Sequence, residues 1–242
     1  MDPHDLDAPS IHPLRAVLFD LDGTLIDSEP NYYEADRRLL ARYGVEFTEE
    51  DKRRYIGTGI QEMVRDLQER HGLPGDPAEL AAEKNALYLE IAERSTEVFP
   101  QMKRFVDHLA AAGVPMAVAS GSSPEVIRRL VRQVGLDGYF PHLVSAEEAG
   151  RSKPAPDVFL EAARRLGVPA EACLVVEDSA PGVEAASRAR MRCIAVPFFT
   201  DPPLAPAYAT ADLLYAGGME TFDADAAWDW VRQQGAPGRA AV

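Results

Sequence analysis

The sequence predicts an α/β fold: a parallel sheet flanked by helices, with a helical segment inserted after the first strand. Two observations support this. From residue 100 onward, apolar runs that indicate buried strands alternate with helical patterns, as in successive βαβ units. Between residues 28 and 98, in contrast, every periodic pattern is helical and no strand is expected. A chain of 242 residues that is 46% hydrophobic can form a large core and one inserted domain.

The first predicted strand and its end are the stretch from Ala16 to Thr24, with the sequence AVLFDLDGT. Its continuous apolar part is typical of a strand buried on both faces. Residues two apart in an extended chain face the same way, so Asp20 and Asp22 can point together from the carboxyl end. Gly23 then permits a tight turn. Neighbouring carboxylates repel each other unless a cation binds or one is protonated, and a bound metal with phosphate chemistry would explain this pair.

The segment 28–98 is predicted to form a second, all-helical domain. Its first helix begins near Ser28, which we expect to act as the cap, with Pro30 in the first turn. Gly44 is expected to end that helix. Three further helices are expected, which begin near Thr48, include Met63, Val64 and Leu67, and run from Ala78 to about Val98.

The remaining strands and helices alternate after Pro100 and complete the sheet. The expected strands are Val114–Ala119, a short one near Leu143–Val144, Cys173–Val176, Arg192–Val196 and Ala211–Tyr215. The intervening helices begin near Pro100, Ser123, Val158, Ser179 and Asp225. The sequence therefore predicts a core of residues 14–27 and 99–235, a helical domain of residues 28–98, and flexible tails at 1–13 and 236–242.

Polar groups follow three of the predicted strands, and a lysine precedes a proline in a loop between two of them. In open α/β sheets, ligands bind outside the carboxyl ends of the strands, so these groups should converge on one crevice. Each group alone could be a solvated turn, a helix cap or a surface lysine, but their conjunction in this order is rare by chance. The groups are Asp20 with Asp22, Ser120 with Gly121, Lys153 with Pro154, and Glu177 with Asp178.

These groups resemble the four motifs of the haloacid dehalogenase superfamily. The stretch Val175–Val183, with the sequence VVEDSAPGV, further resembles the branch that contains β-phosphoglucomutases and small sugar phosphatases. The resemblance covers about residues 14–27 and 100–197. It implies a Rossmann-like parallel-sheet core with the helical segment 28–98 as an inserted cap domain.

The resemblance also implies a role for each motif residue. Asp20 would be the nucleophile that forms an aspartyl-phosphate, and Asp22 would protonate the leaving oxygen and later accept a proton from water. Ser120 and the backbone amide of Gly121 would bind phosphate oxygens. Lys153 would contact both the phosphoryl oxygens and the nucleophile.

A magnesium ion is the cofactor that the resemblance implies. Its ligands would be Asp20, the backbone carbonyl of Asp22, and Asp178, with Glu177 binding directly or through water. Mg²⁺ prefers oxygen ligands in octahedral geometry, and its charge would offset the repulsion between carboxylates and phosphate. The implied activity is hydrolysis of a small phosphorylated metabolite such as a sugar or polyol phosphate.

The alternative within this branch is a sugar phosphate mutase of the β-phosphoglucomutase type. Those mutases have a histidine in the first cap helix and an arginine in a glycine-containing cap loop. Here Tyr32 and Ile60 stand at those positions, so neither an imidazole nor a second phosphate-binding arginine is present, and a phosphatase is favoured. Gly57 and Gly59 either let the cap loop close over the site or form a plain interhelical turn.

Three other functions are disfavoured: carbon–halogen cleavage, carbon–phosphorus cleavage and noncatalytic binding. Dehalogenases and phosphonatases lack the second aspartate, Asp22. Phosphonatases also require a cap lysine, and of the two candidates, Lys52 and Lys84, we expect Lys52 to be solvated because it lies in a charged run with Arg53 and Arg54. A noncatalytic binding protein is the third possibility, and the presence of both Asp20 and Lys153 argues against it.

Charge and cysteine content limit the partners and the compartment. A formal net charge of −14 argues against nucleic acid and anionic membranes as partners. We find neither a signal peptide nor an apolar run of about 20 residues that could span a membrane. The only cysteines, Cys173 and Cys193, lie in apolar runs and are expected to be reduced core thiols in a cytoplasmic protein. A cap of this size suits a monomer.

Overall fold

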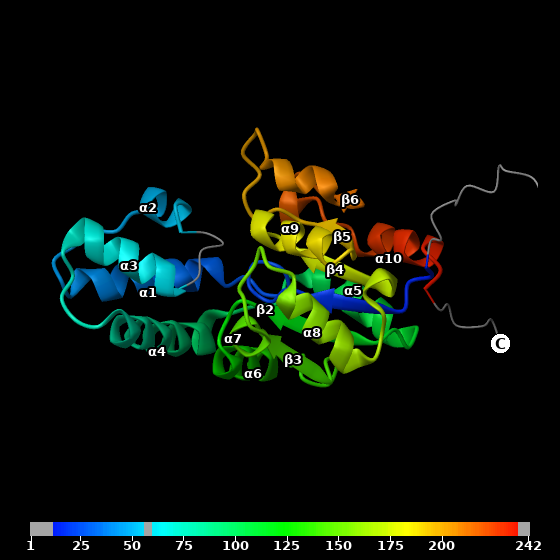
Figure 1. Ribbon diagram of the computed structural model, residues 1–242, viewed down its shortest axis with the longest axis horizontal. Coiled ribbons are helices and arrows are strands. Elements are labelled where there is room, and N and C mark those ends of the chain that lie inside the picture. Colours follow the sequence, from blue (N-terminus) through cyan, green and yellow to red (C-terminus); the bar gives the residue numbers. More distant parts are fainter. Residues whose placement is uncertain (1–11, 56–59, 237–242) are drawn as a thin grey trace, which may run out of the picture.

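The computed structural model describes residues 12–55 and 60–236. Its centre is one parallel sheet with the strand order β3-β2-β1-β4-β5-β6, and helices cover both faces (Figure 1). This arrangement confirms the predicted α/β class. The strands are β1 (Ala16–Phe19), β2 (Met116–Ser120), β3 (His142–Ser145), β4 (Cys173–Glu177), β5 (Arg192–Ala195) and β6 (Leu213–Leu214).

The central strand β1 is buried on both faces because its side chains alternate between two hydrophobic clusters. Val17 and Phe19 belong to one cluster, and Ala16 and Leu18 belong to the other. The first cluster includes residues of α5, α6 and α10, and the second includes residues of α8 and α9. These helices are α5 (Pro100–Ala111), α6 (Pro124–Gln133), α8 (Asp157–Leu166), α9 (Ala180–Arg188) and α10 (Ala224–Gln233).

The segment between β1 and α5 is helical and lies beside the carboxyl edge of the sheet (Figure 1). Its helices pack around a third, smaller cluster that includes Leu40, Phe47 and Met63. We keep the term cap for this segment, and its independence as a domain stays a prediction. The cap helices are α1 (Glu29–Ala41), α2 (Glu49–Arg53), α3 (Ile60–His71) and α4 (Pro77–Ser95).

At most of the predicted helix N-termini, a side chain accepts a hydrogen bond from a backbone amide of the first turn. Thr48 caps α2 in a reciprocal capping box, and the Ser123 hydroxyl accepts a hydrogen bond from the Val126 amide at the start of α6. The cap predicted at Ser28 is wrong in one respect. Ser28 precedes α1, but its backbone has helical dihedral angles and its hydroxyl accepts no hydrogen bond from the helix. An N-cap side chain reaches the helix amides from an extended backbone, which Ser28 does not have.

Several boundaries differ from the prediction. Helix α4 ends at Ser95 because Thr96 is extended, and Val98 forms an isolated antiparallel bridge with Ile26. The last strand has only two residues, and the short helix α7 (Ala146–Ala149) and the 3-10 helices η1 (Ala170–Ala172), η2 (Pro206–Thr210) and η3 (Gly218–Glu220) were not expected. The proposed roles of Gly57 and Gly59, and most of the two predicted tails, lie outside the described residues.

Cys173 and Cys193 are both buried and form no disulfide, as expected. Across residues 12–55 and 60–236, no helix is both long and apolar enough to cross a bilayer.

Candidate active site

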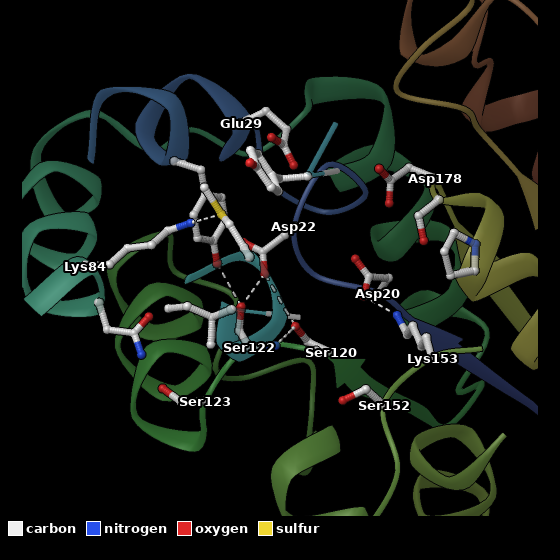
Figure 2. A pocket seen from close by; sticks show the side chains of 18 of the residues that line it. Asp20, Asp22, Glu29, Lys84, Ser120, Ser122, Ser123, Ser152, Lys153 and Asp178 are labelled. Carbon is white, nitrogen blue, oxygen red and sulfur yellow. Dashed lines mark hydrogen bonds and ion pairs between the residues drawn. The ribbon is translucent and has the colours of Figure 1, made fainter. Parts of the chain in front are cut away.

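A cleft of about 200 Å³ lies where the carboxyl ends of β1 and β2 and the residues just after β4 face the cap (Figure 2). The neighbouring order β2-β1-β4 brings Ser120, Asp20 and Asp178 to one edge of the sheet, although they are far apart in the sequence. Gly121 and Lys153 also line this cleft. The predicted convergence of the polar strand ends is therefore seen in the structure.

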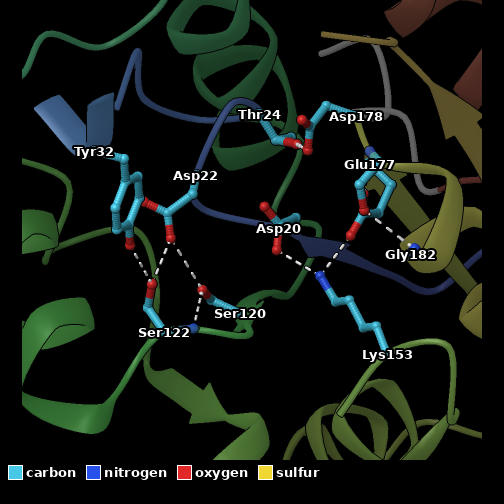
Figure 3. Close-up of polar contacts among 11 residues, drawn as sticks. Asp20, Asp22, Thr24, Tyr32, Ser120, Ser122, Lys153, Glu177, Asp178 and Gly182 are labelled. Atoms are coloured by element: carbon cyan, nitrogen blue, oxygen red, sulfur yellow. Dashed lines mark hydrogen bonds and ion pairs between the residues drawn. The ribbon is translucent and has the colours of Figure 1, made fainter. Parts of the chain in front are cut away.

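Lys153 lies between two carboxylates, Asp20, which follows β1, and Glu177, which is the last residue of β4. Its Nζ is 2.5 Å from Oδ1 of Asp20 and 2.5 Å from Oε1 of Glu177 (Figure 3). Burial alone would lower the pKa of Lys153, but the two carboxylates outweigh it and raise the pKa above its ordinary value. The lysine is therefore a fixed cation beside Asp20.

Glu177 is completely buried, and its position is fixed from two sides. Its Oε2 accepts hydrogen bonds from the Ser179 amide at 2.7 Å and the Ser179 hydroxyl at 2.9 Å, while Oε1 accepts from Lys153. Both carboxylate oxygens thus have partners in the protein.

Asp20, Glu177 and Asp178 form a buried acidic cluster, in which one oxygen of each lies within 4.8 Å of the others. Asp178 accepts a 3.1 Å hydrogen bond from the Thr24 hydroxyl. Gly23, with a φ of +77°, allows the turn to pass close to it, since a Cβ there would lie 2.5 Å from Oδ2 of Asp178. Lys153 is the one ammonium that contacts this cluster within the described residues. Three carboxylates against one ammonium leave excess negative charge, and carboxylate oxygens are the ligands that a hard divalent cation such as Mg²⁺ prefers.

Burial of this cluster changes its protonation. Burial, followed by the charges of Glu177 and Asp22, raises the pKa of Asp20 to about 8 despite the opposing effect of Lys153. Burial also raises the pKa of Asp178, with Glu177 adding to the effect. Folding therefore disfavours ionisation of these two carboxyls when no cation is bound.

A pH dependence of stability follows for the metal-free protein. Because these carboxyls bind protons more tightly in the folded than in the unfolded state, the free energy of unfolding should fall as pH rises between about 5 and about 8. Urea unfolding in the presence of a chelator measures this, and Mg²⁺ added at the upper end of the range should restore stability. A free energy of unfolding that rises or stays level over that range would contradict the expectation.

Asp22 points away from the acidic cluster, towards hydroxyl groups of the core and the cap. Ser122 donates to its Oδ2 at 2.6 Å (Figure 3). Tyr88 of the cap donates to its Oδ1 at 3.2 Å. Tyr32 shares a 2.9 Å hydrogen bond with Ser122, and its ring stacks on that of Tyr88 at a centroid distance of 3.8 Å. Ser120 also lies 3.4 Å from Oδ2 of Asp22. Asp22 is thus held at the boundary between the two parts of the molecule.

The structure adds cap residues that the sequence did not single out as functional. Glu29, Lys52, Lys84 and Asn85 line the cleft opposite Asp20, as does the already named Tyr32. The sequence does contain one indication for Lys84 and Tyr88. They are four residues apart in a predicted helix, so they share one face of it, and a lysine and a tyrosine on one face can both point to the same site. We found no such indication for Glu29.

The expectation that Lys52 is solvated is wrong. Its side chain is only 12% exposed, and its Nζ lies 3.4 Å from Oδ2 of Asp36 and 3.6 Å from Oε2 of Glu29. Successive residues of a helix point in directions about 100° apart, so a charged run does not face solvent as a unit. Arg53 and Arg54 are exposed, whereas Lys52 turns inward.

Residues 14–190 match the model of the haloacid dehalogenase-like hydrolases. The chain is 34% identical over 197 residues, 81% of its length, to the bifunctional riboflavin kinase/FMN phosphatase of Arabidopsis thaliana, but spans only 51% of that protein. It is 33% identical over 182 residues to the fructose-1-phosphate phosphatase YqaB of Escherichia coli (strain K12), covering 74% of this chain and 95% of that one.

A solved structure shows the same architecture. CbbY from Rhodobacter sphaeroides, in complex with xylulose-(1,5)bisphosphate, superposes with a TM-score of 0.74 at 27% sequence identity, covering 87% of this chain and 99% of that chain. The family model covers most of the chain and includes Asp20, Asp22, Ser120, Lys153 and Asp178. The chain therefore belongs to the haloacid dehalogenase-like hydrolases.

Proposed function

We propose that this protein is a Mg²⁺-dependent phosphomonoester hydrolase that acts on a small phosphorylated metabolite, a sugar or polyol phosphate. The observation on which the proposal chiefly depends is the position of Lys153 between Asp20 and Glu177, beside an acidic cluster at the strand ends. The phosphatase relatives support the reaction class. A cytoplasmic location and a monomeric state stay predictions from the sequence.

In the proposed first step, Asp20 attacks the phosphorus atom of the substrate. Lys153 binds Oδ1 of Asp20, which leaves Oδ2 for the attack. The bond between phosphorus and the leaving oxygen breaks as Asp22 donates a proton to that oxygen, and an aspartyl-phosphate forms on Asp20. In the second step, Asp22 accepts a proton from water, the water oxygen bonds to phosphorus, and the phosphate leaves Asp20.

Asp22 must change partners to perform these steps. In the structure its two oxygens accept hydrogen bonds from Ser122 and Tyr88. The leaving oxygen of the substrate would replace one of these hydroxyls. Because Tyr88 belongs to the cap, the position of the cap and the availability of Asp22 are linked.

The phosphoryl oxygens would be bound by Ser120, the backbone amide of Gly121, and Lys153. Asp20, Asp178 and the backbone carbonyl of Asp22 would bind Mg²⁺. When bound, the ion supplies positive charge that offsets the repulsion between the phosphate and the carboxylates. Glu177 already accepts hydrogen bonds at both oxygens, which favours a role through Lys153 or through a water molecule.

Phosphorus NMR with a panel of hexose, pentose and polyol monophosphates tests this proposal. We expect an inorganic phosphate signal to grow in the presence of Mg²⁺ and to stop growing when a chelator removes the ion. Interconversion of 1- and 6-phosphates with a bisphosphate primer would instead indicate a mutase. The bisphosphate bound in CbbY makes that control necessary, whereas Tyr32 and Ile60 argue against a mutase.

A further inference from the structure

Three charged residues of the cap, Glu29, Lys52 and Lys84, line the cleft (Figure 2 labels Glu29 and Lys84). Together with the buried Asp36, which pairs with both lysines, they form a group that we call the cap charge cluster. Lys84 Nζ lies 2.6 Å from Oδ1 of Asp36, and Lys52 Nζ lies 3.4 Å from Oδ2 of the same carboxylate. Lys52 also lies 3.6 Å from Oε2 of Glu29. The four side chains therefore form one continuous chain of ion pairs.

The formal charges of this cluster cancel. Two ammonium groups face two carboxylates, and Asp36, with a side chain only 1% exposed, is enclosed by both lysines. The cluster thus has no excess cation with which to bind a second anionic group of a substrate. At the opposite side of the cleft, Lys153 contacts Asp20, where the phosphoryl group is proposed to bind.

Asp36 lies between the two lysines and does not line the cleft, whereas two members of the cluster that do line it keep unused hydrogen-bonding capacity. Oε2 of Glu29 is buried and receives no hydrogen bond from the described residues, although it lies near Lys52. Lys52 has three N–H donors, and its carboxylate neighbours lie at 3.4 Å and 3.6 Å, beyond the shortest hydrogen-bond distances. Both residues line the cleft. An acceptor beside a donor complements a pair of hydroxyl groups.

We propose that Glu29 and Lys52 bind the leaving group of the substrate, and that this pair selects an uncharged polyhydroxyl group over one with a second phosphate or a carboxylate. The inference rests on the proposed phosphatase function and specifies its substrate class. A second anion would lie against Glu29 and would draw Lys52 away from Asp36, leaving buried carboxylates without compensation, which is costly.

Three small phosphomonoesters that differ in the charge of the leaving group test this specificity. They are glycerol 3-phosphate, 3-phosphoglycerate and phosphoethanolamine. Each releases an alcohol, which is uncharged in the first case, has a carboxylate in the second and has an ammonium group in the third. We expect kcat/KM for glycerol 3-phosphate to exceed that for 3-phosphoglycerate by about tenfold or more.

Two variants should change this preference in opposite directions. Glu29→Gln removes a negative charge, and should reduce the preference for glycerol 3-phosphate over 3-phosphoglycerate by about tenfold. Lys52→Met removes a positive charge, and should increase that preference and improve the relative use of phosphoethanolamine. The control is Glu50→Gln, which removes an exposed carboxylate from the same helix as Lys52 and should leave the preference unchanged.

Hydrolysis of 4-nitrophenyl phosphate separates failure of this inference from failure of the proposed function. Without Mg²⁺-dependent hydrolysis of any ester, the proposed function fails and the inference fails with it. If 4-nitrophenyl phosphate is hydrolysed but 3-phosphoglycerate or phosphoethanolamine is preferred, the inference alone is overturned. The inference would also be overturned if none of the three polar esters were hydrolysed. The same holds if Glu29→Gln and Lys52→Met kept the wild-type preference for glycerol 3-phosphate over 3-phosphoglycerate.

Discussion

Asp20→Asn is expected to lower kcat by a factor of about 10⁴ or more, which is the scale on which loss of a covalent nucleophile acts in enzymes. The amide has almost the shape of the carboxylate but cannot form the aspartyl-phosphate. Lys153 keeps its contact with Glu177, so the cation stays paired in the variant. Phosphate release under saturating substrate and Mg²⁺ measures the effect.

The same variant should remain folded. Burial is the main cause that raises the pKa of Asp20 to about 8, so ionisation of Asp20 opposes folding when no metal is bound. Replacing Asp20 by Asn should therefore leave the metal-free protein at least as stable as the wild type at about pH 8. Urea unfolding provides this comparison. Asp229→Asn, at an exposed position of α10, is the matched control and should change neither turnover nor stability appreciably. Turnover of Asp20→Asn within tenfold of the wild type would contradict the role of Asp20.

The core of the site was predictable because parallel strands impose its geometry. A continuous apolar run that is followed by Asp20 and ends near a glycine is typical of a buried strand, and the carboxyl ends of neighbouring parallel strands share one edge. The strand rule does not place Lys153, which lies in a loop 133 residues from Asp20. Only the resemblance implied the contact between them. The resemblance supplied the expected role of each residue, which geometry alone does not.

The cap side of the site was not predictable in the same way. Which face of a cap helix meets the cleft depends on the rotation of the helix and on its packing against its neighbours, and no periodic pattern in α2 reveals either. Lys52 belongs to a run of three cations, and only the contacts with Asp36 and Glu29 show that it alone turns inward. Tyr88 gives a similar case, since a buried tyrosine in a helix normally indicates core packing, whereas its hydroxyl contacts Asp22.

Gly182→Ala is expected to destabilise the protein by about 2–3 kcal/mol, the upper part of the range of about 1–3 kcal/mol found for overpacked cores. A Cβ on Gly182 would lie 1.8 Å from Oε1 and 1.9 Å from Cδ of Glu177, far inside any permitted contact. Glu177 is fully buried and cannot turn into solvent. Urea unfolding should show the loss, and Gly138→Ala, where a Cβ would meet no atom within 4 Å, should stay within about 0.5 kcal/mol of the wild type.

The activity of Gly182→Ala should fall by about 100-fold or more, even under conditions in which the variant is folded, because a shift of about 1 Å in a catalytic group has effects of that size. Movement of Glu177 would break its hydrogen bonds to Ser179 and its 2.5 Å contact with Lys153, and the lysine would then lose its fixed position beside Asp20. Phosphate release by the folded variant distinguishes this effect from simple instability. Wild-type kcat with reduced stability would show that Glu177 supports the fold without positioning Lys153, whereas loss of both would place the close approach of α9 among the requirements for catalysis.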